Sequence, residues 1–151
     1  MDLTFVFGFL SFIAVLLIHL KFKQIIMTNQ SSNSVKEIAG KLVELCRTGK
    51  MHEAQEQLWS DEVVCISPDM TGGPAVTTKG KKDNMEREKK FAEMIEAVHG
   101  NTISEPVIAG NVFAISWSMD VKLKGQDRMV MDEVCVYHVK DGKIVQEQYI
   151  F

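Results

Sequence analysis

The sequence predicts an α+β domain in which helices come first and a curved antiparallel sheet follows. Apolar residues recur at helical spacing through most of residues 34–98, with one short strand between the second and third helices. From residue 102 onward the apolar period changes to two, which is typical of strands with one buried face. Helices that precede a meander of strands predict a sheet that wraps around them.

The composition supports one globular domain and excludes several classes of function. The chain has 151 residues, of which 46% are apolar and 25% charged. Its net charge of −3 comes without a basic stripe, so nucleic acid is not an expected partner. Three cysteines without a CxxC spacing and four scattered histidines predict neither a disulfide framework nor a metal site. The sequence has no glycine-rich phosphate loop, and no cofactor is expected.

The first 26 residues form a hydrophobic segment outside the predicted domain. Leu3–Leu20 is an uncharged stretch of about 18 residues, just long enough for a separate helix that crosses a bilayer. Because Lys21 follows, a retained anchor would leave the domain on the cytoplasmic side. Alternatively, Met27 is the true start and the protein is soluble. Residues 27–33 are a polar linker, and membrane association is expected only if residues 3–20 are retained.

Three helices are predicted within the domain, which covers residues 34–151. Ser34 and Glu37 have the spacing of a capping box at the start of the first helix. The second is short and covers about Met51–Trp59. The third covers about Lys81–Val98, where apolar residues form one stripe and lysines and glutamates fill the rest. Gly100 is expected to end it.

The predicted strands are bounded by proline and glycine. Asp61–Ser67 is the first, and Pro68 ends it. The segment up to residue 78 is a loop or a poor edge strand. Two further strands, Thr102–Ala109 and Val112–Lys122, are joined by a tight turn.

The last two strands, Met129–Val139 and Lys143–Phe151, form a hairpin around the sequence Lys-Asp-Gly. A two-residue loop would place Val136 opposite Glu147, and a three-residue loop with a left-handed glycine would place Cys135 opposite Glu147. The sequence by itself leaves both registers open. In the second register, one face of the hairpin carries Glu133, Cys135, Tyr137, Val145, Glu147, Tyr149 and Phe151.

From Ser34 to Phe151 the sequence resembles the SnoaL-like branch of the nuclear transport factor 2-like superfamily, which also holds the ketosteroid isomerases. The resemblance is carried by LVELCRTGKMHEAQEQLWSDEV, by TTKGKKDNMEREKKF and above all by DEVCVYHVKDGKIVQEQYIF. It implies a cone-shaped sheet of the cystatin-like roll type, a pocket for a small hydrophobic molecule, and a homodimer formed through the convex sheet face. It also favours the three-residue hairpin loop. This fold hosts enzymes and non-enzymatic modules alike.

The catalytic residues of the ketosteroid isomerases do not carry over to this chain. Alignment of the hairpin puts Cys135 where their proton-donating aspartate stands, and Ser67 falls near their general-base aspartate. Their oxyanion tyrosine corresponds to a position near Lys41. Steroid isomerisation by that mechanism is therefore not expected.

The two hairpin glutamates are the main candidates for chemistry. In the bulged register Glu133 and Glu147 are diagonal neighbours with Cβ atoms roughly 7 Å apart or less. Burial and like charge would raise the pKa of at least one of them, which suits general acid/base catalysis. Tyr137 or Tyr149 is a candidate hydrogen-bond donor, and Asp69 is a further candidate base. The expected pocket-lining residues are Trp59, Ser67, Met70, Trp117, Met119, Met131, Cys135, Tyr137 and Phe151.

Each candidate also has a structural interpretation. The glutamates could be tied to basic or tyrosine side chains, Asp69 could simply belong to a turn, and Cys135 could be a buried core residue. Two hypotheses for function follow. One is acid/base chemistry of the isomerase, cyclase or hydrolase type on a small hydrophobic substrate, and the other is a non-catalytic ligand-binding or dimerisation module.

Overall fold

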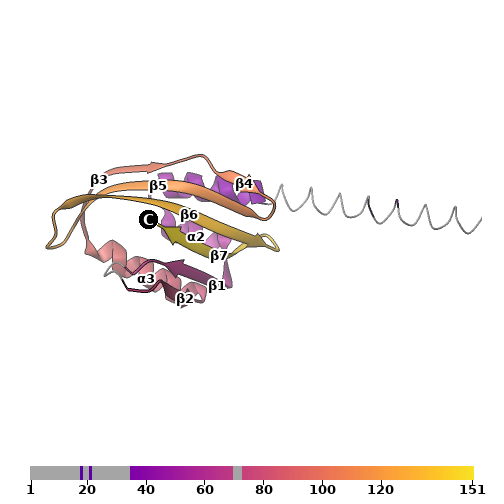
Figure 1. Ribbon diagram of the computed structural model, residues 1–151, viewed down its shortest axis with the longest axis horizontal. Helices are drawn as coiled ribbons and strands as arrows, with labels where there is room; N and C mark the ends of the chain where they lie inside the picture. The colour runs from indigo at the N-terminus through magenta and orange to yellow at the C-terminus, as the bar shows by residue number, and fades with distance from the viewer. Residues whose placement is uncertain (1–17, 19–20, 22–34, 70–72) are drawn as a thin grey trace, which may run out of the picture.

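The computed structural model describes residues 18, 21, 35–69 and 73–151 (Figure 1). The described part of the first helix covers residues 35–47, so the proposed capping residue Ser34 lies outside it. The other helices are α2, Met51–Leu58, and α3, Lys81–Met94. The strands are β1 (Trp59–Ser67), β2 (Val76–Lys79), β3 (Ile95–Ile103), β4 (Val107–Ala109), β5 (Val112–Leu123), β6 (Arg128–Lys140) and β7 (Lys143–Ile150).

The strands form one sheet in the order β2-β1-β7-β6-β5-β3, and β4 pairs separately with β5. All pairs are antiparallel except β1 and β7, which run parallel. Figure 1 shows the sheet curling from β3 and β5 at the top of the view to β1 and β2 at the bottom, with the helices on its inner side. The predicted α+β fold with a curved sheet around helices is therefore confirmed.

The main core lies between the first helix and the concave face of the sheet. Leu42 of that helix is fully buried with Phe113 of β5 and Tyr137 of β6. The Tyr137 ring stacks on Phe113 at 4.7 Å and meets Trp59 edge-on at 6.0 Å, measured between ring centroids. Such aromatic packing adds about 1 kcal/mol per pair beyond the burial of area. Two of these rings, Trp59 and Tyr137, lie next to Glu147, a polar residue of the concave face.

The boundary between α3 and β3 differs from the prediction. The helix was expected to continue to Val98, but it ends at Met94, and Val98 is an exposed strand residue. The reason is tertiary, because residues 95–103 pair with β5 along almost their whole length. The expected strand 102–109 is in turn divided between β3 and β4, with Pro106 between them, which has no N–H to donate to a ladder.

The hairpin follows neither of the two expected registers along its whole length. Asp141 (φ 51°) and Gly142 (φ 74°) form a two-residue loop, so the predicted three-residue loop is wrong. Beyond the loop a bulge at Val145 shifts the register by one residue, and Tyr137 then lies opposite Glu147. One face of the hairpin therefore carries Glu133, Cys135, Tyr137, Glu147 and Tyr149.

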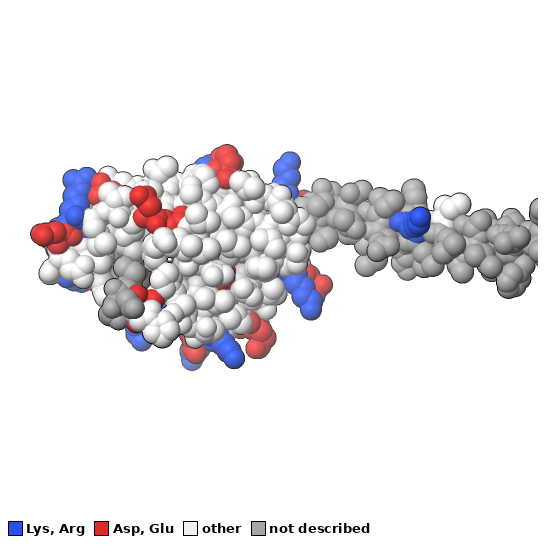
Figure 2. All heavy atoms as spheres, in the orientation of Figure 1, with Lys and Arg blue, Asp and Glu red and all other residues white. Residues whose placement is uncertain are grey.

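Most of the N-terminal predictions fall outside the described residues. Of Leu3–Leu20, the structure describes only Ile18, whose side chain is exposed, and Lys21 is the next described residue. Among the residues that the structure describes, no helix is both long and apolar enough to span a membrane. Charged side chains of both signs are interspersed on the face of the domain shown in Figure 2, in keeping with the absence of a basic stripe from the sequence.

Candidate functional site

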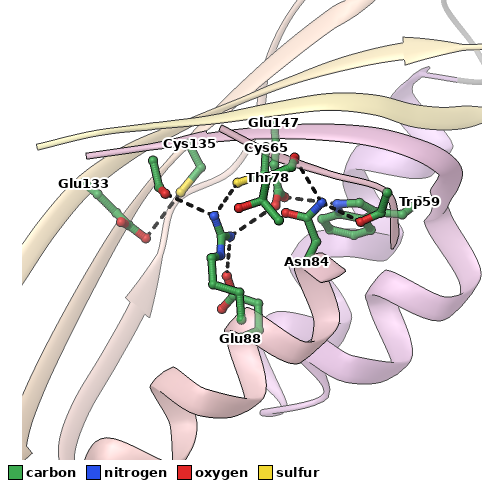
Figure 3. Close-up of polar contacts among 11 residues, drawn as sticks. Trp59, Cys65, Thr78, Asn84, Glu88, Glu133, Cys135 and Glu147 are labelled. Atoms are coloured by element: carbon green, nitrogen blue, oxygen red, sulfur yellow. Dashed lines mark hydrogen bonds and ion pairs between the residues drawn. The ribbon is translucent and has the colours of Figure 1, made fainter. Parts of the chain in front are cut away.

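Polar side chains from four elements meet on the concave face of the sheet beside α3. Figure 3 shows Glu133 and Cys135 at one end of this group and Trp59 at the other, with Glu88 below on α3. We call the group the concave cluster. It consists of Cys65, Ser67, Arg87, Glu88, Glu133, Cys135, Glu147 and Tyr149.

Helix α3 is fixed beside the sheet by its first turn. Gly80 has a φ of 86°, a left-handed conformation that favours glycine, and its N–H donates to the carbonyl of Val63 at 2.8 Å. Asn84 is buried, and its Nδ2 donates to the carbonyl of Gly80 at 2.8 Å. One turn further on, Arg87 faces the sheet. The anchored first turn therefore positions the one guanidinium of the concave cluster.

Glu147 is the most deeply buried acid among the described residues, with no exposed surface. Its Oε2 accepts a hydrogen bond from Trp59 Nε1 at 3.1 Å. Its Oε1 accepts none and lies 3.7 Å from Arg87 Nη2, which is an ion pair but too long for a hydrogen bond. Burial, reinforced by the nearby charge of Glu88, raises the pKa of Glu147 from 4.5 to about 7. Protonation of this carboxyl therefore changes near neutral pH.

Glu133 lies nearer to the surface and has fewer polar neighbours. It is opposite Trp117 in the pairing of β5 with β6, and 9% of its surface is exposed. The thiol of Cys135 donates to its Oε1 at 3.5 Å. Burial is the main reason that the pKa of Glu133 is also raised from 4.5 to about 7. This carboxyl is mostly desolvated and close to half-protonated at neutral pH.

Arg87 connects the two sides of the concave cluster. Its Nη1 donates to Cys65 Sγ at 2.8 Å and to Ser67 Oγ at 3.1 Å, and its Nη2 donates to Glu88 at 2.6 Å. The guanidinium also lies 5.6 Å from the centre of the Tyr149 ring, a cation–π distance. Since arginine stays charged at all ordinary pH values, it is a fixed positive charge beside the buried carboxyls.

Two tyrosines and two thiols complete the surroundings. The hydroxyl of Tyr137 is fully buried without a hydrogen-bond partner, and burial raises the pKa of both Tyr137 and Tyr149 well above 10. Both phenols are therefore neutral donors at neutral pH. Burial also raises the pKa of the Cys65 and Cys135 thiols far above the ordinary range, so neither is a ready nucleophile.

The remaining residues expected at the site lie in different places. Asp69 follows β1, and its carboxylate packs against Gly73 in the next loop, while Met70 lies outside the described residues. Met119 and Met131 belong to a second, smaller apolar cluster, against which Phe91 of α3 also packs. Phe151 at the chain end is mostly exposed. Trp117 is buried, and its Nε1 donates to Asn101 at 2.6 Å.

Sequence reasoning missed Arg87 and Glu88. They lie in the charged segment MEREKKF, whose composition is typical of a solvent-exposed helix face. One signal was present, because Arg87 is the one arginine among the lysines of α3. Arginine is the preferred cation for partly buried ion pairs, so an isolated arginine in a lysine-rich helix is a candidate for an inward-facing contact.

The described residues offer little support for a site elsewhere. Within the described residues, no group of three or more histidine, cysteine or acidic side chains could hold a metal ion. An open groove of about 720 Å³ lies between α2 and α3, and none of the expected pocket-lining residues borders it. Its walls mix lysines with acids, including the 2.7 Å ion pair of Lys81 with Asp61. The concave cluster is therefore the candidate site.

Comparisons with known proteins place this chain in a family. A family model described as a SnoaL-like domain matches residues 33–151. A Mesorhizobium loti protein, provisionally described as a SnoaL-like polyketide cyclase and, in brackets, as a carbohydrate phosphatase, is 32% identical with a TM-score of 0.70. That match covers 76% of this chain and 97% of the other. No curated protein matches the chain.

Two more distant structures show the fold alone. A protein of unknown function with a cystatin-like fold from Xanthomonas campestris is 19% identical with a TM-score of 0.64, over 77% of this chain and 88% of that one. A protein with a ketosteroid isomerase-like fold from Catenulispora acidiphila, solved with trimethylamine, is 18% identical with a TM-score of 0.54, over 65% and 72%. The chain therefore belongs to the SnoaL-like domain family, and it shares its fold with ketosteroid isomerase-like proteins.

Proposed function

We propose that this SnoaL-like domain transfers protons on a small apolar substrate that carries a carbonyl group. The observation that carries the proposal is Glu133, a carboxyl that is 9% exposed, has a pKa near 7 and has a thiol as its one hydrogen-bond partner among the described residues. A general base works best when its pKa lies near the operating pH, because it is then both available and strong enough to accept a proton.

The other members of the concave cluster have supporting roles in this proposal. Glu133 would take a proton from the carbon next to the carbonyl and return it at another position. Arg87 or the Tyr149 hydroxyl would stabilise the negative charge that develops on the carbonyl oxygen. Glu147 forms an ion pair with Arg87 and would hold the guanidinium in place. The provisional description of the Mesorhizobium loti protein as a polyketide cyclase agrees with a carbonyl-bearing substrate.

Proton exchange into a model ketone tests the proposal. With 2-tetralone in D2O, the protein is expected to catalyse deuterium incorporation next to the carbonyl, followed by proton NMR. The rate should rise with pH and level off above about 7, since the ionised form of Glu133 is the base. Glu133→Gln should reduce exchange to the buffer rate, and Glu56→Gln on the exposed side of α2 should not change it. A protein that binds 2-tetralone without exchanging it would instead support the non-catalytic ligand-binding module.

We also propose that two copies pair through the convex face of the sheet. Val130, Val134 and Ile150 are exposed there, and Val134 lies directly opposite Ile150. Exposed apolar side chains that adjoin on a sheet are suited to burial against a second copy. Sedimentation velocity at micromolar concentration tests this, and a monomer at all concentrations would contradict it.

A further inference from the structure

The charges of the concave cluster do not balance, and this imbalance indicates a substrate class. Its acids are Glu88, Glu133 and Glu147, whereas Arg87 is its one basic side chain. An anionic ligand would have to enter beside three carboxyl groups. A cationic ligand would complete the balance instead, and the ring of Tyr149 already lies 5.6 Å from one cation, the Arg87 guanidinium.

We propose that the concave cluster recognises a small organic cation, a protonated amine or a quaternary ammonium group on an apolar body. The inference rests on the proposed function, because it places the cation of the substrate beside the same base, Glu133. Glu88 is the expected counter-ion, since it comes from α3 at the partly exposed side of the cluster, with about a quarter of its side chain accessible.

A buried oxygen without a hydrogen bond indicates how Glu88 could be released from Arg87. Arg87 Nη2 donates to Glu88 at 2.6 Å, whereas Glu147 Oε1, fully buried and without a hydrogen bond, lies 3.7 Å from the same nitrogen. A ligand cation that takes Glu88 would free Arg87 to move toward Glu147 and satisfy its Oε1. A buried carboxylate oxygen without a hydrogen bond raises the free energy of the folded protein. Glu147 Oε1 is in that state while Arg87 bonds to Glu88, so movement of Arg87 toward Glu147 would be favourable.

Cation binding should be linked to proton release. A positive charge favours the ionised forms of Glu133 and Glu147, whose pKa values lie near 7. Affinity for a permanent cation should therefore fall as the pH drops below 7, by up to about tenfold per pH unit for each proton released. The charged and titratable groups that act on Glu133 are Cys135 of β6 and Glu88 and Arg87 of α3. Those that act on Glu147 are Glu88 and Arg87 of α3, Cys65 of β1 and Tyr149 of β7.

Three probes of one shape and different charge test the inference. Choline is the cation, 3,3-dimethylbutan-1-ol its neutral counterpart and 3,3-dimethylbutanoate its anionic one, and binding is measured by calorimetry at pH 6, 7 and 8. At pH 8, choline is expected to bind at least tenfold more tightly than the alcohol, and the anion most weakly. The preference should shrink at pH 6. Equal binding of choline and the alcohol at pH 8, or a preference for the anion, would overturn the inference.

Variants assign the effect to Glu88. Glu88→Gln should reduce the choline preference to about twofold or less, whereas Glu88→Asp, which keeps the charge, should retain part of it. Glu62→Gln on the exposed side of β1 is the matched control and should bind as the wild type does. A choline preference that survives Glu88→Gln in a folded protein would contradict the assignment. The exchange of uncharged 2-tetralone tests Glu133 without any cation, so the two proposals can fail separately.

Discussion

Replacing Glu147 with glutamine should make the protein more stable at pH 8 and leave its stability nearly unchanged at pH 4.5. The pKa of Glu147 is about 7 in the folded protein, against 4.5 for an unperturbed glutamate. The folded state therefore binds more protons than the unfolded state between these values, and stability falls as the pH rises through this window. The difference corresponds to at most about 3 to 4 kcal/mol, because each pKa unit is worth about 1.4 kcal/mol.

Glutamine removes this penalty because it carries no charge at any pH. Its amide oxygen can still accept the hydrogen bond from Trp59, so the packing should be retained. Urea denaturation at the two pH values measures the effect, with Glu62→Gln on the exposed side of β1 as the control. A Glu147→Gln variant that is less stable than the wild type at pH 8 would show that the pair with Arg87 outweighs burial and that Glu147 is an ordinary structural acid.

Arg87→Met should destabilise the protein at pH 8 by about 2–4 kcal/mol, since removal of one partner leaves buried charge uncompensated. The loss should be smaller at pH 4.5, where Glu147 is protonated and needs no cation. Removal of the guanidinium should also move the pKa of both Glu133 and Glu147 further upward, because Arg87 lowers both in the wild type.

Two further variants separate this effect from loss of packing. Lys90→Met changes an exposed cation on the same helix and should alter stability by about 0.5 kcal/mol or less. In the double variant Arg87→Met/Glu147→Gln, the glutamine should stabilise the Arg87→Met protein at pH 8 by more than it stabilises the wild type, because it removes a charge that Arg87 no longer compensates. If the two single effects simply add, Arg87 and Glu147 are not energetically coupled.

The fold was predictable from the sequence because its signals are periodic. Alternation in residues 112–122 and 129–139 identifies half-buried strands, and β5 and β6 lie there. The end of α3 was not predictable in the same way. Residues 95–98 continue the apolar spacing of the helix, and pairing with β5 decides that they form a strand. Local patterns cannot show which long-range partner will compete for a segment.

The shared face of the two glutamates was expected from the sequence, but through the wrong turn. A three-residue loop was expected, whereas the protein has a two-residue loop followed by a bulge at Val145. The two arrangements shift the register by one residue in opposite directions, to Cys135 or to Tyr137 opposite Glu147, and both bring Glu133 and Glu147 to one face. Nothing in the residue types around Val145 identifies the bulge in advance. The side-chain periodicity could therefore be predicted, but the position of the irregularity could not.

Glu133 and Glu147 are both expected to hold protons near neutral pH on the concave face of this domain. Carbon-13 NMR of protein labelled at the glutamate side-chain carboxyl tests it directly, with Glu133→Gln and Glu147→Gln assigning the signals. Two glutamate resonances should titrate with midpoints near pH 7, well above the others. If both titrate near the ordinary value of 4.5, neither carboxyl is tuned by burial, and the proposed proton transfer loses its base.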